Sequence, residues 1–521
     1  MNKPPQNFLA RLLAELSRRR VYPEIAAYAV VAFILLQLGE ITFAPLGLPN
    51  WVMVALIVLV ILGFPVVIVL AWVFDITPSG IRRTPPISEL DQRPSIAVLP
   101  FVDMSPELNQ GFFCEGVAEE ILNALTKIPE LKVAARSSSF QYQRGSGDIR
   151  DIGRELGVRT ILEGSVRKSE NRIRVTAQLV NSSDGYHLWS RTFDAELKDV
   201  FAIQDEIASS IANALLETLQ PKDQLAIQTT SPTDVSAYEY YLRGRHFFKR
   251  FRGRDIEYAL QMFGEAIAID ADYAPAWAGY ADCHSFMVMY MNPQAEFREE
   301  ASKASKRAVE LDPDLAEAHA SRGLACLVCE EFDSAEAEFE RAIELNPNLF
   351  EAYYYYARTK FHRGEMAAAA ELFRKAAEVD PADYQSRCLR VQVLRGAGQL
   401  DQARREAREA IDVIERHIKW FPDDARAFHL GAGSLITVGD IERAKRWLRR
   451  ATEIDPDDSV VLYNVACNLA MLGEKEEALD HLERAAEQGA VSAAWMRNDE
   501  DLVSLRNDAR YTALLERPDN S

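Results

Sequence analysis

Residues 315–347, LAEAHASRGLACLVCEEFDSAEAEFERAIELNP, decide the fold of the carboxyl-terminal half of this chain. The stretch ends in a short turn signal, and similar signals recur along the chain. They are IDAD at 269, LDPD at 311, LNPN at 345, VDPA at 379, FPDD at 421 and IDPD at 454. The prolines of these signals are evenly spaced except for one longer interval. They are Pro313, Pro347, Pro381, Pro422 and Pro456.

The even spacing has a period of about 34 residues, which is typical of tetratricopeptide repeats (TPR), in which each unit is a pair of helices. The internal pattern of the quoted stretch agrees. Gly323, Ala335 and Ala342 supply small residues where the helices cross, and Phe339 supplies an aromatic ring between them. Other units place similar residues at Phe428, Ala444, Leu448 and Ala451, and at Ala259, Phe263 and Ala266.

The longer interval, from Pro381 to Pro422, contains seven extra residues near IERHIKW, residues 414–420. Seven residues make two helical turns, so the second helix of that unit is longer but keeps its apolar face in register. We expect an all-α TPR solenoid of about seven helix pairs over 237–489, followed by an end cap and tail over 490–521.

The first helices of such a solenoid line a concave groove that binds peptides or protein faces. Tyr353 and Tyr356 are expected to pack within their repeat. For each residue expected in the groove, a place in the core or on a solvated face stays open as the alternative. The residues expected in the groove are Tyr354, Arg358, His362, Arg426, His429 and Tyr463.

The amino-terminal region contains two apolar runs, about 25–43 and 51–74. Each has about the 20 residues that cross a bilayer as a helix, and the connector APLGLPN contains no charge. Residues 23–74 therefore predict a two-helix transmembrane hairpin that contacts the lipid bilayer. Residues 1–22 predict a basic amphipathic segment beside the membrane, and 75–93 a linker.

Arginines and one lysine flank the two runs on their outer sides, at Lys3, Arg11, Arg18, Arg19, Arg20, Arg82, Arg83 and Arg93. The positive-inside rule then places both termini and the bulk of the chain in the cytoplasm. The predicted location is a bacterial inner membrane, with two spans.

Residues 94–222 predict a small α/β domain. PSIAVLPF, LKVAA, TILEGSVRK, RIRVTAQLV and GYHLWSRTFD are expected to be strands, and three helical segments separate or follow them. Asp148 is placed to cap the second of these helices.

Four stretches of this region, SIAVLPF, FFCEGVAEEILNAL, ILEGSVRK and GYHLWSRTFD, resemble the TolB-like domain that precedes TPR repeats in many bacterial proteins. Members of that family often carry a winged-helix, nucleotide cyclase or protein kinase domain ahead of this unit, and some inherit the label adenylate cyclase. The resemblance implies no enzymatic activity here, because this chain has the apolar hairpin in that position.

The sequence holds no recognisable catalytic, cofactor-binding or metal-binding motif. It contains no phosphate loop, no HExxH and no kinase signature. Cys326 and Cys329 lie within a repeat helix, and packing explains them better than zinc does. The stretch ARSSSF, residues 135–140, could offer hydroxyls and an arginine to an anion, although a crossing from strand to loop is the simpler interpretation.

GYHLWSRTFD contains the residue types of a hydrolytic triad, His187, Ser190 and Asp194. In a strand His187 and Ser190 point to opposite faces, and Ser190 and Asp194 lie roughly 13 Å apart. These residues therefore cannot relay a proton. His187, Trp189, Arg191 and Phe193 are expected to share one face.

The net charge is −19, and most of the excess acid lies beyond residue 93. Such a surface argues against nucleic acid as the main partner. The sequence predicts a non-catalytic scaffold or sensory adaptor with protein or peptide partners, no cofactor and an undetermined oligomeric state. The alternative is a signalling protein linked to nucleotide cyclase activity or to transcriptional regulation.

Overall fold

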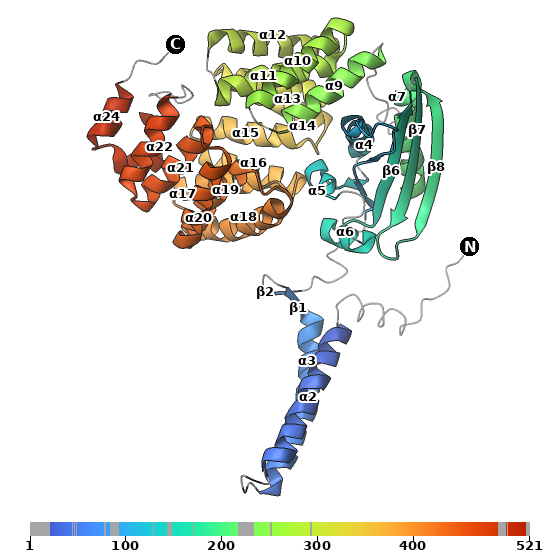
Figure 1. The fold of residues 1–521 in the computed structure, drawn as a ribbon, viewed down its shortest axis with the longest axis vertical. Helices are drawn as coiled ribbons and strands as arrows, with labels where there is room; N and C mark the ends of the chain where they lie inside the picture. Colours follow the sequence, from blue (N-terminus) through green and yellow to red (C-terminus); the bar gives the residue numbers. More distant parts are fainter. Residues whose placement is uncertain are drawn as a thin grey trace. The chain divides into compact units, whose positions relative to one another are not determined.

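The computed structural model of the chain consists of two compact units, Met1–Gln92 and Arg93–Ser521 (Figure 1). The residues that the structure describes are 21–43, 45, 47, 49–77, 80–83, 93–128, 130–142, 148–169, 171–216, 234–250, 253–291, 294–487, 496–497 and 499–516.

The first unit is a helical hairpin made of α2 (Val21–Phe43) and α3 (Asn50–Val73). The Tyr28 hydroxyl donates a hydrogen bond to the Val60 carbonyl at 2.6 Å, and a Cβ built on Gly39 would lie 3.0 Å from Leu56. These contacts make the two helices antiparallel. Two short strands, β1 (Phe74–Thr77) and β2 (Gly80–Arg83), form an antiparallel ladder after them.

The structure corrects one prediction for this unit. Among the described residues, no helix combines the length and the apolar character needed for a bilayer crossing. The predicted location in a bacterial inner membrane with two spans is overturned by this finding. Most of the predicted segment 1–22 lies outside the described residues.

The second unit begins with a six-stranded mixed sheet of order β5-β3-β6-β7-β8, to which β4 adds by pairing with β6. β3 runs parallel to β5 and β6, and the last three strands form an antiparallel meander. The strands are β3 (Ser95–Val98), β4 (Val102–Asp103), β5 (Lys132–Val133), β6 (Thr160–Ser169), β7 (Arg172–Asn181) and β8 (His187–Glu196).

Helices cover both faces of this sheet. α4 (Gly111–Thr126) and α7 (Val200–Leu215) bury one face in the main core, whereas the short helix α6 (Ile149–Leu156) packs on the other face. The Asp148 side chain accepts a hydrogen bond from the Arg150 amide at 2.9 Å, which confirms the predicted cap of α6. A short helix, α5 (Arg136–Phe140), lies between β5 and α6.

The TPR array follows as seven helix pairs among the described residues of 235–487. They are α9 (Val235–Phe248) with α10 (Gly253–Ile269), α11 (Ala274–Tyr290) with α12 (Ala295–Leu311), α13 (Ala316–Val328) with α14 (Phe332–Leu345), α15 (Phe350–His362) with α16 (Met366–Val379), α17 (Tyr384–Gly396) with α18 (Leu400–Trp420), α19 (Ala425–Val438) with α20 (Ile441–Ile454), and α21 (Ser459–Leu472) with α22 (Lys475–Glu487). Two short segments, η3 (Glu500–Leu505) and α24 (Ala509–Leu515), come after them.

The packing within a repeat follows the predicted pattern. Ala335, Phe339 and Ala342 are fully buried, and a Cβ built on Gly323 would lie 2.7 Å from the Phe339 ring. Helix α18 has 21 residues, whereas α16 and α20 have 14 each. The predicted lengthening of this helix by two turns is therefore confirmed.

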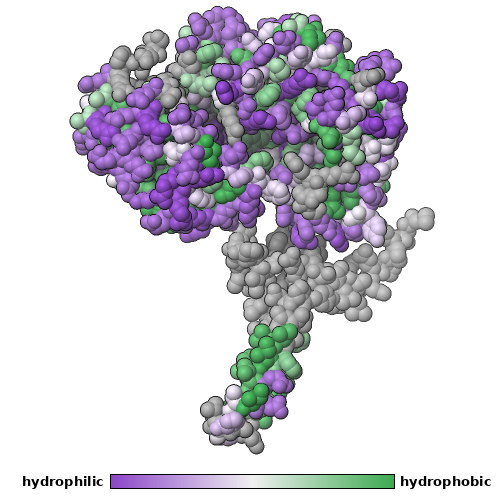
Figure 2. Space-filling model, viewed as in Figure 1, coloured by the Kyte–Doolittle hydropathy of each residue, from purple (hydrophilic) through white to green (hydrophobic). Residues whose placement is uncertain are grey.

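The α/β region and the start of the array share one core. Tyr238 of α9 packs its ring against Phe113 of α4 and Phe201 of α7, with centroids 6.2 and 4.7 Å apart. Leu242 of the same helix fills the space over Gly116 of α4. The first repeat is thus part of the α/β core. On its visible face, the second unit presents mainly hydrophilic residues to solvent (Figure 2).

Candidate functional site

Three predicted groove residues, Tyr354, Arg358 and His362, lie four residues apart on α15 and so form one stripe of that helix. Arg426 and His429 stand at the start of α19, two repeats further on. Because each is on the first helix of its pair, the curvature of the solenoid brings the two stripes toward each other.

The two stripes meet on a tyrosine from a third helix, Tyr290 at the end of α11. Arg358 Nη1 and Arg426 Nη2 both donate hydrogen bonds to the Tyr290 hydroxyl oxygen, the latter at 3.1 Å. Their guanidinium carbons also lie 5.3 and 5.0 Å from the centre of the Tyr290 ring. All three side chains are half-buried. Two cations from distant repeats therefore share one neutral acceptor.

The two guanidinium groups change the acidity of this phenol. Burial acts to raise the pKa of Tyr290, but the nearby charges of Arg358 and Arg426 outweigh it and lower the pKa to about 8. The phenol is therefore still mainly protonated at neutral pH, and it offers the guanidinium groups no negative charge there.

Tyr354 and His429 flank this meeting point with buried polar atoms. Tyr354 is 5% exposed and His429 2%. Among the described residues, neither the Tyr354 hydroxyl nor either His429 ring nitrogen has a hydrogen-bond partner. Burial and the Arg426 charge lower the pKa of His429 to about 3, so this ring is neutral. We call Tyr290, Tyr354, Arg358, Arg426 and His429 the groove cluster.

The other two predicted groove residues lie apart from this cluster. His362 is exposed at the end of α15, where crowding by the surrounding protein and the Arg358 charge lower its pKa. Tyr463 of α21 donates a hydrogen bond to Asp499 at 2.6 Å, so it ties the last pair to the segment after the array.

The periodicity did not reveal Tyr290. Helix α11 has 17 residues, against 13 in α13 and α15, and Tyr290 lies in the added turn. A sequence signal for this turn exists, because the turn signals at 269 and 311 lie further apart than those at 311 and 345.

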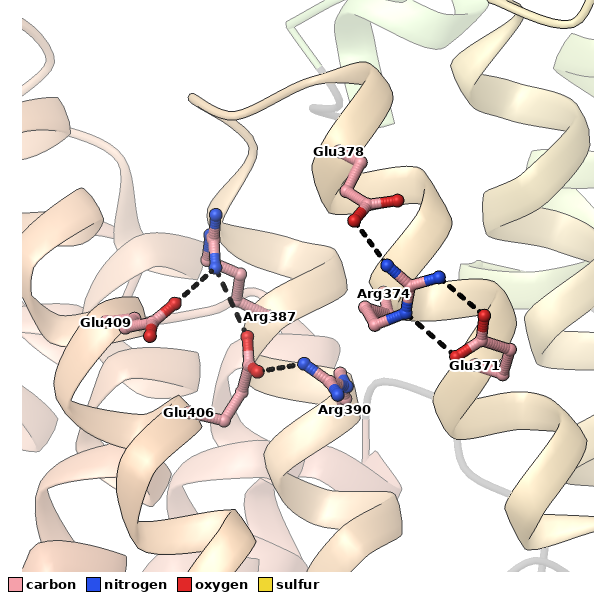
Figure 3. Close-up of polar contacts among 7 residues, drawn as sticks. All are labelled: Glu371, Arg374, Glu378, Arg387, Arg390, Glu406 and Glu409. Carbon is pink, nitrogen blue, oxygen red and sulfur yellow. Dashed lines mark hydrogen bonds and ion pairs between the residues drawn. The ribbon is translucent and has the colours of Figure 1, made fainter. Parts of the chain in front are cut away.

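Several arginines elsewhere in the array have carboxylate partners. Arg387 and Arg390 of α17 both contact Glu406 of α18, whose carboxyl group is buried, and Arg387 also reaches Glu409 at 3.1 Å (Figure 3). Arg374 of α16 lies between Glu371 and Glu378 of the same helix (Figure 3). The groove cluster differs from these ion pairs because its guanidinium groups converge on a phenol.

The residues that suggested a triad are not assembled. Asp194 accepts hydrogen bonds from Arg172 and Arg174, and His187 is exposed. Trp189, Arg191 and Phe193 lie on one face of β8, as expected, and the Trp189 and Phe193 rings are neighbours. Arg191 forms an ion pair with Glu206 of α7 at 2.6 Å. A bulge where β7 pairs with His187 interrupts the alternation, so His187 does not continue that face.

The stretch ARSSSF connects the two regions of the second unit. Ser137 and Ser138 both donate hydrogen bonds to the Asp380 carboxylate, in the turn between α16 and α17. Burial and the neighbouring Asp383 raise the pKa of Asp380 to about 6. Beside this contact, Asn348 Nδ2 donates to the Thr126 carbonyl at 3.2 Å. The α/β region thus reaches across to the fourth and fifth repeats.

A second polar contact holds α4 against α9. Glu119 is 7% exposed and pairs with Arg136 at 2.9 Å, Arg245 at 2.6 Å and Lys249 at 2.5 Å. Burial acts to raise the pKa of Glu119, but the three cations outweigh it and hold the pKa well below its usual range. Among the described residues, no group of histidine, cysteine and carboxylate side chains could hold a metal ion.

Comparison with known proteins agrees with the repeat architecture. The tetratricopeptide repeat family matches residues 316–349, 338–371 and 425–458. The chain therefore carries TPR repeats, in a mostly helical solenoid joined to a small mixed sheet.

One curated relative, "Putative adenylate cyclase 3" of Rhizobium meliloti (strain 1021), is 35% identical over 261 residues. The match covers 50% of this chain and 44% of the relative, so this chain spans less than half of the relative's length. Among solved structures, a human IFIT1 dimer with m7Gppp-AAAA is similar with 17% identity and a TM-score of 0.41, over 60% of this chain and 72% of that chain. The TPR protein YrrB is similar with 22% identity and a TM-score of 0.25, over 38% and 95%.

Proposed function

We propose that this protein is a non-catalytic scaffold or sensory adaptor that binds a protein or peptide partner in its TPR groove. The observation that carries the proposal is the groove cluster, in which residues of three different repeats converge on Tyr290. Half-buried cations on the inside of a solenoid can bind one specific group of a partner. A repeat protein that only separates two domains would not need such cations.

The α/β region, which resembles a TolB-like domain, serves in this proposal as a base for the array. Its core is continuous with the first repeat, and its helix α5 contacts the turn at Asp380. Such contacts restrain the curvature of the solenoid and hold the groove open in one shape. TPR folds are typically non-catalytic, which favours this function over an enzyme.

A photo-crosslinking experiment in cells tests the proposal. A benzophenone amino acid replaces His362, which lies exposed at the end of α15, and a matched variant carries it at Glu371 on α16. We expect one defined partner to crosslink at position 362 and not at 371, and Arg358→Gln to reduce that product. Equal crosslinking at both positions, or an unchanged yield with Arg358→Gln, would contradict groove binding.

A second candidate function rests on the relative named as an adenylate cyclase, which favours a signalling protein linked to that activity. Purified full-length protein with ATP and Mg²⁺ distinguishes the two. We expect no cyclic AMP, and turnover that survives repeated purification would replace the scaffold proposal by the catalytic one.

A further inference from the structure

Strand β8 is the last strand on one side of the six-stranded sheet, so one of its edges faces away from the sheet (Figure 1). Among the described residues, β8 pairs with β7 alone. This pairing is regular from Trp189 to Glu196, and the bulge lies before it, between Leu179 and Val180 of β7. The strand also contains no proline. A long, regular edge of this kind presents a row of backbone groups on which another strand can add.

The backbone groups that point outward belong to the even-numbered residues of β8. The Leu197 amide donates a hydrogen bond to the Asn171 carbonyl at 2.8 Å, which continues the ladder with β7. Because hydrogen-bonded and non-bonded pairs alternate in an antiparallel ladder, Ser190, Thr192 and Asp194 direct their N–H and C=O groups away from β7. Their side chains lie on the exposed face of the sheet. The edge therefore has donors and acceptors at the spacing that an antiparallel strand requires.

The acidic side chains along this edge already have partners within the chain. Asp194 accepts hydrogen bonds from Arg172 at 2.5 Å and from Arg174 at 3.0 Å. Glu196 pairs with Lys198 at 2.8 Å. The hairpin of β7 and β8 carries three arginines and three acidic residues, whereas the whole chain has a net charge of −19. A second copy can thus approach this edge without the repulsion that acidic surfaces of two copies would cause elsewhere.

A row of threonines reaches the same edge. Thr176 of β7 lies directly opposite Thr192 of β8, and their hydroxyl oxygens are 3.3 Å apart. A two-fold axis at Thr192 would place this residue opposite Thr192 of a second copy and would extend the row of threonines across both sheets. Ser190 of each copy would then lie opposite Asp194 of the other, where its hydroxyl can donate to the carboxylate.

Other positions of the axis are less favourable. An axis at Arg191 or at Asp194 would place two like charges directly opposite each other. Phe193 is 6% exposed, so an axis there would oppose two rings that already pack in their own cores. An axis at Ser190 would bring the bulged end of β8 into the pairing. The axis at Thr192 avoids these conflicts.

We propose that two copies of this chain form a dimer by antiparallel pairing of their β8 edges, with the two-fold axis at Thr192, so that the two sheets become one. The occupant of the edge is a second copy because the charges and the threonine row are complementary to themselves. Such a dimer carries two TPR arrays, so a partner with two binding segments would be held by both. This inference goes beyond the proposed function and does not depend on it.

Sedimentation velocity of the full-length protein tests the dimer. A single strand edge is a small interface, so we expect a Kd on the order of 1–100 µM. Thr192→Lys places two cations at the axis and should raise the Kd at least about 10-fold. Thr192→Pro should do the same, because it removes an N–H that only the second copy uses.

The matched control is Thr176→Lys, which puts the same charge on the inner neighbour of Thr192. The two copies of residue 176 would lie three strand spacings apart, roughly 14 Å, so the Kd should change by less than about 3-fold. Circular dichroism of each variant separates a lost interface from a lost fold.

A disulfide experiment locates the axis. In the proposed register the two Thr192 Cα atoms lie about 5.5 Å apart, a distance that a disulfide can bridge. Thr192→Cys should therefore give a covalent dimer on oxidation with copper phenanthroline, whereas Thr176→Cys should not. The wild type, whose six cysteines are free, gives the background.

Three results would contradict the inference. The first is a protein that stays monomeric up to about 100 µM. The second is a dimer that Thr192→Lys and Thr192→Pro both leave intact, since its interface would lie elsewhere. The third is a dimeric Thr192→Cys protein that forms no disulfide, which would exclude the axis at Thr192. Crosslinking of a partner at position 362 can persist in each case, so these failures are distinct from a failure of the proposed function.

Discussion

Arg426 donates a hydrogen bond to the Tyr290 hydroxyl oxygen at 3.1 Å although the two residues are 136 positions apart in the chain. Tyr290 belongs to the second repeat and Arg426 to the sixth, so this bond closes the inner side of the array across four repeats. Arg358 of the fourth repeat meets the same oxygen. Contacts of this kind fix the curvature of the solenoid, which pairwise stacking of neighbouring repeats leaves adjustable.

The pKa of Tyr290 reports whether Arg358 and Arg426 contact its hydroxyl group. Spectrophotometric titration of the full-length protein should show one tyrosine that ionises near pH 8, because the two guanidinium groups stabilise the phenolate. Tyr290→Phe should remove this step and leave the tyrosines that ionise at higher pH. Arg374→Gln serves as the control and should keep the step. A titration identical in the wild type and Tyr290→Phe would show that the arginines do not act on this phenol.

The same shift predicts how stability depends on pH. The pKa of Tyr290 is lower in the folded protein than the unfolded value of about 10. Ionisation therefore stabilises the fold fully above about pH 10, and this contribution is lost as the pH falls through 8. Relative to Tyr290→Phe, the urea midpoint of the wild type should rise between pH 8 and pH 10. A constant difference between the two proteins over this range would contradict the assigned shift.

Helix crossing within a repeat depends on Gly323. A methyl group at this position would lie 2.7 Å from the Phe339 ring, which is itself fully buried and cannot move away freely. Gly323→Ala should lower the free energy of unfolding by about 1–3 kcal/mol. Gly396→Ala is the control, since no atom lies within 4 Å of the position its Cβ would take. Chemical denaturation measures both, and equal effects would contradict close packing at Gly323.

The contact between α5 and the array should respond to pH through Asp380. Its pKa is raised to about 6 in the folded protein, above the unfolded value of about 4. The stability gained from the protonated form is complete below about pH 4 and is lost as the pH rises through 6. The wild type should therefore lose stability relative to Asp380→Asn over this range, by about 1–3 kcal/mol.

Asp380→Asn is a mild change, because the equivalent turn of the preceding repeat has Asn346, which is also buried. Asp457→Asn, in an exposed turn, provides the control for a loss of charge. Hydrogen exchange at α5 reports whether the contact opens. An Asp380→Asn protein with the same pH dependence as the wild type would exclude Asp380 as the titrating group.

The repeat architecture could be predicted from the sequence because its determinants are local. The spacing of prolines, the small residue at Gly323 and the ring of Phe339 are set within single units, and the family matches confirm the TPR repeats. Even the longer helix α18 could be predicted, since two added turns preserve its apolar face.

The meeting of Tyr290, Arg358 and Arg426 could not be predicted in the same way. Periodicity indicates which face of a helix a residue occupies, but it does not give the curvature that brings three helices from different repeats to one point. Tyr290 also lies in an added turn of α11, outside the repeat pattern. Nor does periodicity indicate that Tyr463, another predicted groove residue, donates a hydrogen bond to Asp499.

Glu119 is the residue whose loss should most weaken the junction between α4 and α9. Its buried carboxylate pairs with Arg136, Arg245 and Lys249, so Glu119→Gln removes the one negative charge that all three cations share. We expect the free energy of unfolding to fall by about 3 kcal/mol. Glu130→Gln, at an exposed position after α4, should change it by less than about 0.5 kcal/mol. Hydrogen exchange should rise first in α4 and α9, and an unchanged exchange rate in both helices would show that other contacts hold this junction.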